Sequence, residues 1–310
     1  MFEVTAIYLK IFRLLRVYRN VFMLAGAYFA FYLFDKNIES VIESVLVAFL
    51  GLSLIAFGNY GINEICDAKY DKFHPDKKYR GLIQHDISKL NVLVISIALW
   101  GAGILCGIYL DNLPVILSLS ALIISGIFYN VNPIRLKDVV YLDFIFESIN
   151  NPIRLLIGWY SVAGANQLVP SSFILMYWFL GMFLMSSKRY SEMRFINKNS
   201  DRDSLIGYRK SFKYYSEEKL LICIVTSLMI FTYVFGALCF KYSIDLILFL
   251  PALIIFIIWY FSLLFDNNSV LKDPESIFKN KPFIIYNIFC LLFFLYLLTQ
   301  QIGLFRWLLE

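Results

Sequence analysis

The sequence predicts an all-α membrane protein with about nine transmembrane helices around a central cavity. Of its 310 residues, 60% are hydrophobic and only 16% are charged, and the mean hydropathy is +0.68. A soluble domain could not bury that much apolar surface. Apolar runs of about 20 residues also recur along the chain, which is the length a helix needs to cross about 30 Å of hydrocarbon. Helices satisfy their own backbone hydrogen bonds there.

The apolar runs are separated by short polar breaks, which set the expected spans. We expect these at residues 20–34, 44–62, 90–109, 113–129, 139–160, 170–187, 220–239, 244–265 and 283–301. Since no internal repeat is visible, residues 1–310 are expected to form a single domain. Lys10 and three arginines interrupt the N-terminal stretch, so we expect no removable signal peptide. The five cysteines lie far apart, which favours neither a disulfide framework nor a zinc site.

The distribution of lysine and arginine predicts the orientation in the membrane. These residues concentrate in the loops on the N-terminal side, whereas the opposite side carries Lys36, Lys241 and Arg306. Basic loops are typical of the cytoplasmic side. The two longest polar loops, 63–89 and 188–219, are therefore both expected to be cytoplasmic.

The first polar loop begins with oxygen-bearing side chains at a helical spacing. Asn63, Asp67 and Asp71 follow one another at intervals of four residues, so a helix places them in one stripe. Mg²⁺ prefers such oxygen ligands and often bridges carboxylates to substrate phosphates. Several cations that could contact phosphates follow at once, among them Lys77, Lys78 and Arg80. The alternative is a solvated loop whose mixed charges have no ligand.

The second polar loop carries a different combination of charges. On a helix, Lys188 and Arg189 lie four and three residues from Glu192, which pairs one carboxylate with two cations. Such a face can hold an anion directly, although the membrane topology alone would also explain the cations. Asp201 and Asp203 suggest either a displaced metal pair or, with better precedent for so short a pair, a helix cap.

Charged residues within the expected fifth span should face the protein interior, because a charge at the bilayer centre costs about 2.5–3.5 kcal/mol. Asp143, Glu147 and Arg154 have a spacing that could form one stripe, either along the cavity or as a structural ion pair. Arg135 and Lys137 lie at the basic entrance, where a lipid phosphate or topology alone could account for them.

The run from Asn63 to Arg80 resembles the first aspartate motif of the UbiA superfamily of intramembrane prenyltransferases. It reads Asn-acidic-x-x-Asp-x-x-x-Asp-x-x-His-Pro-x-Lys-x-x-Arg. The resemblance implies a UbiA-like fold in which Asn63, Asp67 and Asp71 bind Mg²⁺ and the donor diphosphate. Two positions depart from the usual motif: Glu64 replaces an aspartate, and Gly81 replaces a proline.

The second polar loop lacks the superfamily's second aspartate pair and is similar to one particular branch. Lys188-Arg-Tyr-Ser-Glu192, followed by Arg202, Leu205 and Tyr208, resembles the decaprenyl-phosphate phosphoribosyltransferases. That likeness implies transfer of a 5-phosphoribosyl group from 5-phosphoribosyl diphosphate to a polyprenyl phosphate during cell-envelope biosynthesis. The implied catalytic residues are Asp67, Asp71 and Glu192. The implied substrate-binding residues are Lys77, Lys78, Arg80, Arg135, Lys137, Arg154, Lys188, Arg189, Tyr190 and Arg202.

Two other functions remain open at this point. One is a prenyltransferase that joins a polyprenyl diphosphate to an aromatic acceptor such as 4-hydroxybenzoate, which must dispose of a ring proton, whereas a polyprenyl phosphate is already an anionic nucleophile. The other is a transporter, since charges within membrane spans often mark a substrate path. Membrane lipid is the expected surrounding, no nucleic-acid partner is expected, and neither the oligomeric state nor the isoprenoid length follows from the sequence.

Overall fold

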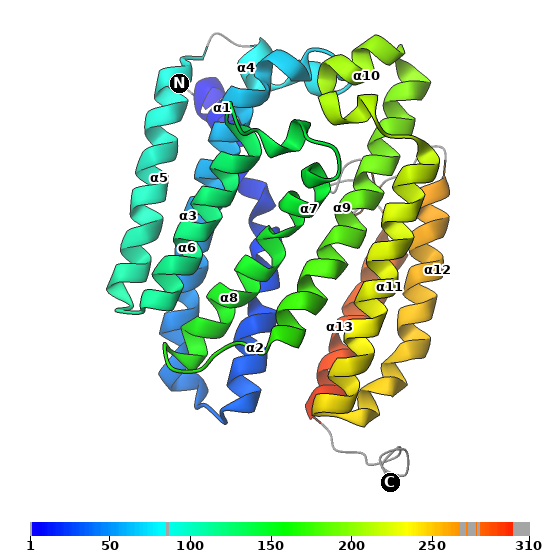
Figure 1. Cartoon of the computed structure of the whole chain (residues 1–310). Coiled ribbons are helices and arrows are strands. Elements are labelled where there is room, and N and C mark those ends of the chain that lie inside the picture. The colour runs from blue at the N-terminus through cyan, green and yellow to red at the C-terminus, as the bar shows by residue number, and fades with distance from the viewer. Residues whose placement is uncertain (1, 85–86, 267–270, 272–276, 278–279, 300–310) are drawn as a thin grey trace. The chain divides into compact units, whose positions relative to one another are not determined.

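The computed structural model describes residues 2–84, 87–266, 271, 277 and 280–299. Every regular element in this part of the chain is a helix, which confirms the predicted all-α class (Figure 1). The chain forms two compact units. The first comprises Met1–Pro170 and Ser200–Tyr215, and the second comprises Ser171–Asn199 and Ser216–Glu310.

The first unit contains nine α-helices among the described residues and four short 3-10 helices. In chain order these are α1 (Phe2–Ile11), η1 (Leu14–Phe22), α2 (Met23–Leu33), α3 (Ile38–Asp71), η2 (Lys77–Tyr79), α4 (Gly81–Gln84), α5 (Lys89–Tyr109), α6 (Leu113–Asn130), η3 (Leu136–Asp138), α7 (Leu142–Ser148), α8 (Asn150–Ala163), α10 (Arg202–Tyr208) and η4 (Lys210–Lys213).

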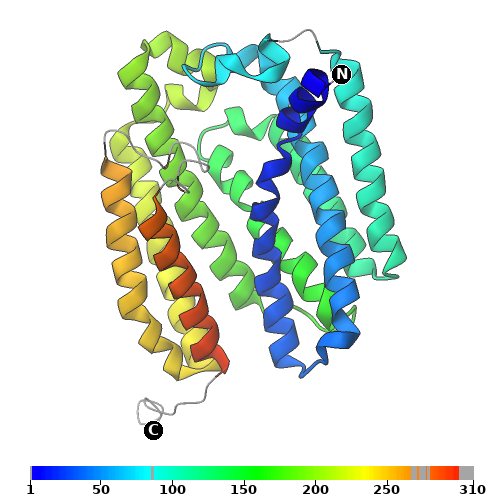
Figure 2. The ribbon, with the colours of Figure 1, turned by 180° about the vertical axis from the view of Figure 1, so that it is seen from behind.

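Helix α3 is the longest element of this unit and carries the predicted stripe. Asn37 caps its N-terminus by accepting a hydrogen bond of 3.1 Å from the backbone N–H of Glu39. Its 34 residues extend about 50 Å, well beyond the hydrocarbon thickness of about 30 Å. The C-terminal turns of α3 therefore project toward the membrane surface. Figure 2 shows the N-terminal segment, in dark blue, running along α3.

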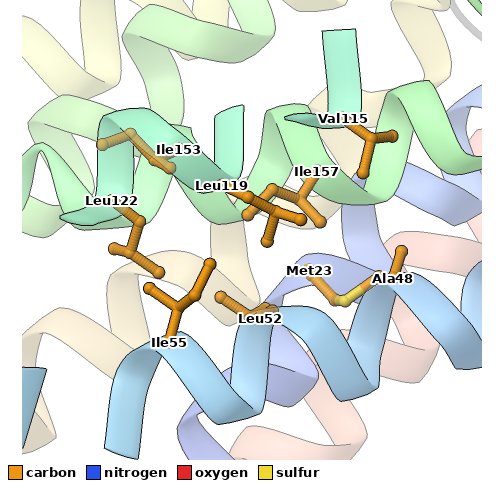
Figure 3. Packing of buried hydrophobic residues seen from close by; sticks show 9 residues of the cluster. All are labelled: Met23, Ala48, Leu52, Ile55, Val115, Leu119, Leu122, Ile153 and Ile157. Carbon is orange, nitrogen blue, oxygen red and sulfur yellow. The ribbon is translucent and has the colours of Figure 1, made fainter. Parts of the chain in front are cut away.

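An apolar core joins four helices of the first unit and fixes α3 in place. It is formed by buried side chains of α2, α3, α6 and α8, which interdigitate in Figure 3: Met23, Ala48, Leu52, Ile55, Val115, Leu119, Leu122, Ile153 and Ile157. Lipid is as apolar as these side chains, so their close packing, rather than exclusion of water, holds the helices together.

Two glycines allow α2 and α8 to touch through their backbones. A Cβ atom on Gly26 would lie 2.0 Å from the carbonyl oxygen of Leu155, and one on Gly158 would lie 1.9 Å from that of Met23. Small residues that admit such close contact are typical of helix pairs in membranes.

The predicted span at 139–160 is divided in the structure, into α7 and α8, which are interrupted at Ile149. Pro152 explains the break, because it has no N–H to donate to the carbonyl of Ser148 one turn earlier. Asp143 and Glu147 therefore share α7, whereas Arg154 lies on α8, so the three expected stripe residues do not lie on one helix.

The second unit contains α9 (Ser171–Asn199), α11 (Glu217–Tyr242), η5 (Ile244–Phe249), α12 (Leu250–Phe265) and α13 (Lys281–Thr299). Aromatic side chains fill the contacts of α12 and α13. The ring centroids of Phe256 and Phe283 lie 5.8 Å apart, and those of Trp259 and Tyr286 lie 5.7 Å apart. These distances are typical of packed aromatic pairs.

Six helices of the described chain are long and apolar enough to cross a membrane. They occupy 38–71, 89–109, 113–130, 217–242, 244–265 and 281–298. The other predicted spans, 20–34, 139–160 and 170–187, fall on α2, on α7 with α8, and on α9, which do not combine that length with that apolar character. The count of nine stays a prediction, and residues 300–301 of the last predicted span lie outside the described residues.

Candidate functional site

The predicted stripe lies on the last turns of α3, as expected from its spacing. Asn63, Asp67 and Asp71 all belong to this one helix. Asp71 is 2% exposed and Asp67 is 9% exposed, so both carboxylates are shielded from solvent. Four residues of helix rise separate them by about 6 Å along the axis. Shielded carboxylates at such a distance require compensating positive charge.

Asp67 obtains that compensation from the chain that follows α6. Its Oδ1 accepts a hydrogen bond of 2.9 Å from Nη2 of Arg135 and forms an ion pair with the Lys137 ammonium. Its Oδ2 accepts a hydrogen bond of 3.0 Å from Nδ2 of Asn63. Arg135 and Lys137 are themselves buried, so the three charged groups depend on one another.

Asn130, the last residue of α6, joins the stripe to these cations, and it was not among the residues predicted from the sequence. Its side-chain oxygen accepts hydrogen bonds of 2.6 Å from Asn63 and 3.1 Å from Lys137. Burial, helped by neighbouring Arg135 and Arg209, lowers the pKa of Lys137 to about 8, although Asp67 acts to raise it. Keeping the Lys137 ammonium charged in this buried position therefore costs free energy.

Asp71 is paired with Arg80, which comes from the loop after α3. Nη1 of Arg80 donates to Oδ2 of Asp71. Burial alone would lower the pKa of Arg80, but Asp71 and then Glu64 raise it above its ordinary value. His74 orders the same loop, because its Nδ1 accepts hydrogen bonds of 3.1 Å and 3.2 Å from the backbone N–H groups of Asp76 and Lys77. His74 therefore fixes the backbone of this loop.

Two further predicted phosphate ligands lie on this loop and have different surroundings. Lys77 donates to the hydroxyl of Tyr208, whose ring centroid lies 4.6 Å from the Lys77 ammonium. Lys78 is exposed, and its ammonium lies 5.2 Å from the ring centroid of Tyr79. Of the two lysines, Lys77 is therefore the one whose side chain is positioned by a contact with Tyr208.

The segment Ser200–Tyr215 belongs to the first unit and brings Tyr208 to this loop. Asp201 caps α10 by accepting a hydrogen bond of 2.9 Å from the backbone N–H of Ser204, which confirms the helix-cap interpretation. Tyr208 lies edge-on against His74, with ring centroids 4.8 Å apart. Arg202, a predicted substrate ligand, is exposed at the start of α10.

Arg154 lies on α8, away from the ion pairs of the stripe. Its Nε donates a hydrogen bond of 3.4 Å to Oδ1 of Asn20, and its Nη1 donates one of 3.2 Å to the backbone oxygen of Asn150. Asn20 in turn donates to Ser53 of α3 at 3.1 Å. These contacts place Arg154 beside the N-terminal segment that precedes α2.

In the second unit, α9 carries the predicted combination of one carboxylate and two cations. Nη1 of Arg189 lies 3.2 Å from Oε2 of Glu192, and the two side chains are 0% and 1% exposed. The hydroxyl of Tyr190 donates a hydrogen bond of 3.3 Å to Glu217 of α11. Lys188 is partly exposed. Arg189 and Glu192 are therefore a buried ion pair. Removal of only one partner of such a pair strongly destabilises a protein.

The donor set on α3 fits a magnesium ion that shares its coordination with a phosphate. Among the described residues, no three or more His, Cys, Asp and Glu side chains gather closely enough to hold a metal by themselves. Asp67, Asp71 and Asn63 supply two carboxylates and an amide oxygen. Mg²⁺ commonly takes one or two carboxylates and completes its shell with waters and substrate phosphates.

The fold is similar to that of a protein of known structure. A UbiA homolog from Archaeoglobus fulgidus, solved with GPP and Mg²⁺ bound, superposes with a TM-score of 0.66. The match covers 94% of this chain and 99% of the homolog, at 18% sequence identity. At that identity the likeness describes the fold.

Sequence comparisons give two partial relatives and one family. The nodulation protein NoeC of Azorhizobium caulinodans is 25% identical over 166 residues, which are 53% of this chain and 52% of NoeC. A protoheme IX farnesyltransferase of Staphylococcus aureus is 30% identical over 90 residues, 29% of each chain. The chain thus spans about half of the length of NoeC and under a third of the length of the farnesyltransferase. The profile of the UbiA prenyltransferase family, however, matches residues 21–298. The chain is a multi-pass membrane protein that belongs to the UbiA prenyltransferase family.

Proposed function

We propose that the protein is a magnesium-dependent phosphoribosyltransferase that moves a 5-phosphoribosyl group from its diphosphate donor to a polyprenyl phosphate. The observation that carries the proposal is the buried Arg189–Glu192 pair next to Lys188 on α9. A second metal site would need more than one carboxylate, whereas this segment offers two cations and one carboxylate. Cations suit a substrate that brings its own negative charge.

In this reaction an oxygen of the polyprenyl phosphate attacks C1 of the ribose as the bond from C1 to the diphosphate breaks. The diphosphate leaves with the electron pair, and a fully ionised acceptor phosphate has no proton to lose. Bound at Asn63, Asp67 and Asp71, Mg²⁺ would neutralise the charge that grows on the leaving oxygens. Arg80 and Lys77, which lie in the loop beside these ligands, would hold the same diphosphate.

The other predicted residues receive the following roles in the proposed reaction. Arg135 and Lys137 would contact a phosphate while they hold Asp67 in place. Glu192 would orient Arg189, and Lys188 with Tyr190 would help position the sugar phosphate. Both long polar loops would face the cytoplasm, where a water-soluble sugar donor is available, in agreement with their basic character.

The rival activity within the family is prenyl transfer to an aromatic acceptor. It is favoured by the relatives, since one is a protoheme IX farnesyltransferase and the archaeal homolog was solved with GPP and Mg²⁺. Such a donor would use the same α3 stripe for its diphosphate. The two activities differ in what the remaining cations must bind.

A transfer assay separates these activities. Purified protein is given labelled 5-phosphoribosyl diphosphate and polyprenyl phosphate, with Mg²⁺ or with EDTA, and the lipid extract is counted. We expect a labelled lipid that forms only with Mg²⁺. A parallel reaction contains a labelled prenyl diphosphate and 4-hydroxybenzoate. A product there, with none in the first reaction, would overturn the proposal in favour of aromatic prenylation.

A further inference from the structure

A second group of cations lies in the first unit, around Tyr60 of α3. Arg13 and Arg16 lie with their guanidinium carbons 5.3 Å and 5.9 Å from the centroid of the Tyr60 ring. Arg19 and Arg154 are close enough to act electrostatically on the hydroxyl of the same tyrosine. We refer to Arg13, Arg16, Arg19 and Arg154 as the four-arginine cluster.

The local conformation explains why Arg16 and Arg19 share one side of the chain. They are spaced three residues apart within η1, a 3-10 helix, which has three residues per turn. Their side chains therefore stand in line. Arg13 precedes the helix as its N-cap, in a left-handed conformation with φ of 51°. Runs longer than three or four residues are uncommon for 3-10 helices, yet η1 extends over nine residues.

The cluster gathers four positive side chains beside two acidic ones, Glu64 and Glu147. Arg13 pairs with Glu64 at 3.2 Å, and Glu147 acts electrostatically on Arg19. Each of the four arginines nevertheless keeps part of its surface exposed. Crowded, partly accessible guanidinium groups are stabilised when an anion joins them.

The four-arginine cluster lies close enough to the stripe for one substrate molecule to reach both. Tyr60 precedes Asp67 by seven residues, which is about two turns, so both lie on one face of α3 about 10 Å apart. Arg13 connects the two groups, because its Nη2 donates a hydrogen bond of 3.3 Å to Oδ1 of Asn63. A single ligand with two separated phosphate groups can therefore reach both, and so can two ligands bound side by side.

We propose that the four-arginine cluster binds a phosphate monoester next to the diphosphate on the α3 stripe. Guanidinium forks match the oxygens of such a group. The inference rests on the proposed function for the identity of that ester, which is either the 5-phosphate of the donor or the phosphate of the lipid acceptor. Both offer the same dianionic chemistry to the cluster.

Binding is tested first, without any transfer reaction. Calorimetry measures the binding of ribose 5-phosphate and of inorganic phosphate, without Mg²⁺, to the wild type, Arg16→Gln, Arg16→Lys and Lys36→Gln. Lys36 is exposed on a loop outside the site, so its variant is the control for loss of one charge. We expect Arg16→Gln to weaken binding at least tenfold, Arg16→Lys to weaken it less, and Lys36→Gln to leave it unchanged. Absence of binding to the wild type, or equal binding to Arg16→Gln, overturns the inference.

Kinetics then identify the source of the phosphate. Arg16→Gln is assayed with the donor and the acceptor varied separately, after its melting temperature has been compared with that of the wild type. A raised KM for the donor alone assigns the cluster to the 5-phosphate, and a raised KM for the acceptor alone assigns it to the lipid phosphate. Unchanged KM values for both overturn the inference. If no transfer occurs in the wild type, the proposed function fails, while the binding measurement still decides the fate of the cluster.

Discussion

The hydroxyl of Tyr215 donates a hydrogen bond of 2.5 Å to Oδ1 of Asp143, a fully buried carboxylate on α7. Ser211 donates to the other oxygen of Asp143 at 3.2 Å, and Arg209 lies 3.7 Å from that oxygen. The chain after α10 is thereby fastened to α7, and with it Tyr208, which holds Lys77. The sequence left Asp143 open between a cavity lining and a structural ion pair, and its contacts agree with the structural alternative because they position a loop.

Tyr215→Phe should lower the stability of the first unit and loosen donor binding. The Tyr215 hydroxyl also accepts a hydrogen bond of 2.7 Å from the backbone N–H of Tyr141, so its loss leaves two buried groups without their partner. Such a loss costs about 1–3 kcal/mol. We expect a lower melting temperature and a higher donor KM. Tyr214→Phe is the matched control, because Tyr214 is 58% exposed, and equal melting temperatures for the two variants would contradict the assignment.

Asp67→Asn and Asp71→Asn should both abolish transfer but should differ in stability. Asp67 compensates two buried cations, Arg135 and Lys137, whereas Asp71 compensates Arg80, whose side chain is 24% exposed. Leaving a buried charge unpaired costs about 3–5 kcal/mol. Asp67→Asn should therefore melt at a lower temperature than Asp71→Asn. Adding Lys137→Met should restore part of the stability of Asp67→Asn but none of its activity. Near-normal turnover in both single variants would refute their role as metal ligands.

Gly158→Ala should destabilise the protein far more than alanine at another helical glycine. The added Cβ would meet the carbonyl oxygen of Met23 at 1.9 Å, so α2 and α8 would have to separate. Overpacking of this kind costs about 1–3 kcal/mol. Gly101→Ala is the control, because nothing lies within 4 Å of the position of its Cβ. Thermal unfolding in detergent compares the two, and a similar melting temperature for both would show that the helix contact is not tight.

Lys188→Ala and Glu192→Gln should separate substrate binding from folding on α9. Lys188 is partly exposed, so its loss should raise the donor KM and leave the melting temperature unchanged. Glu192→Gln leaves the fully buried Arg189 without its carboxylate, so it should lower both the melting temperature and the yield. If Lys188→Ala changes only the yield, its charge serves membrane topology alone.

The sequence was sufficient for the features that depend on helical period. Apolar runs predicted an all-α membrane protein, and a spacing of four residues predicted that Asn63, Asp67 and Asp71 share a helix. What it could not provide were contacts between distant segments. Asn130 contacts Asn63 because α6 packs on α3. The side chains that bind the Asp143 carboxylate come from a loop almost seventy residues later in the chain.

The three N-terminal arginines show the same limit more sharply. Their spacing is visible in the sequence, but there it indicates only the membrane orientation and the absence of a removable signal peptide. On an α-helix a spacing of three advances by 300° at each step, so Arg13, Arg16 and Arg19 would fan apart. In η1, a 3-10 helix that contacts α3, Arg16 and Arg19 instead stand in line, and Arg13 precedes them as the N-cap.

The winding of η1 also makes the length of this segment more critical than its composition. A 3-10 helix rises about 2 Å per residue, against about 1.5 Å in an α-helix. One inserted residue between Arg16 and Arg19 would shift the phase of everything before it by a third of a turn and turn Arg13 and Arg16 away from Tyr60. Exchanges among apolar residues such as Leu15, which is 91% exposed, leave that phase intact. In related chains, insertions and deletions should therefore be rarer between Arg13 and Arg19 than substitutions at the positions in between.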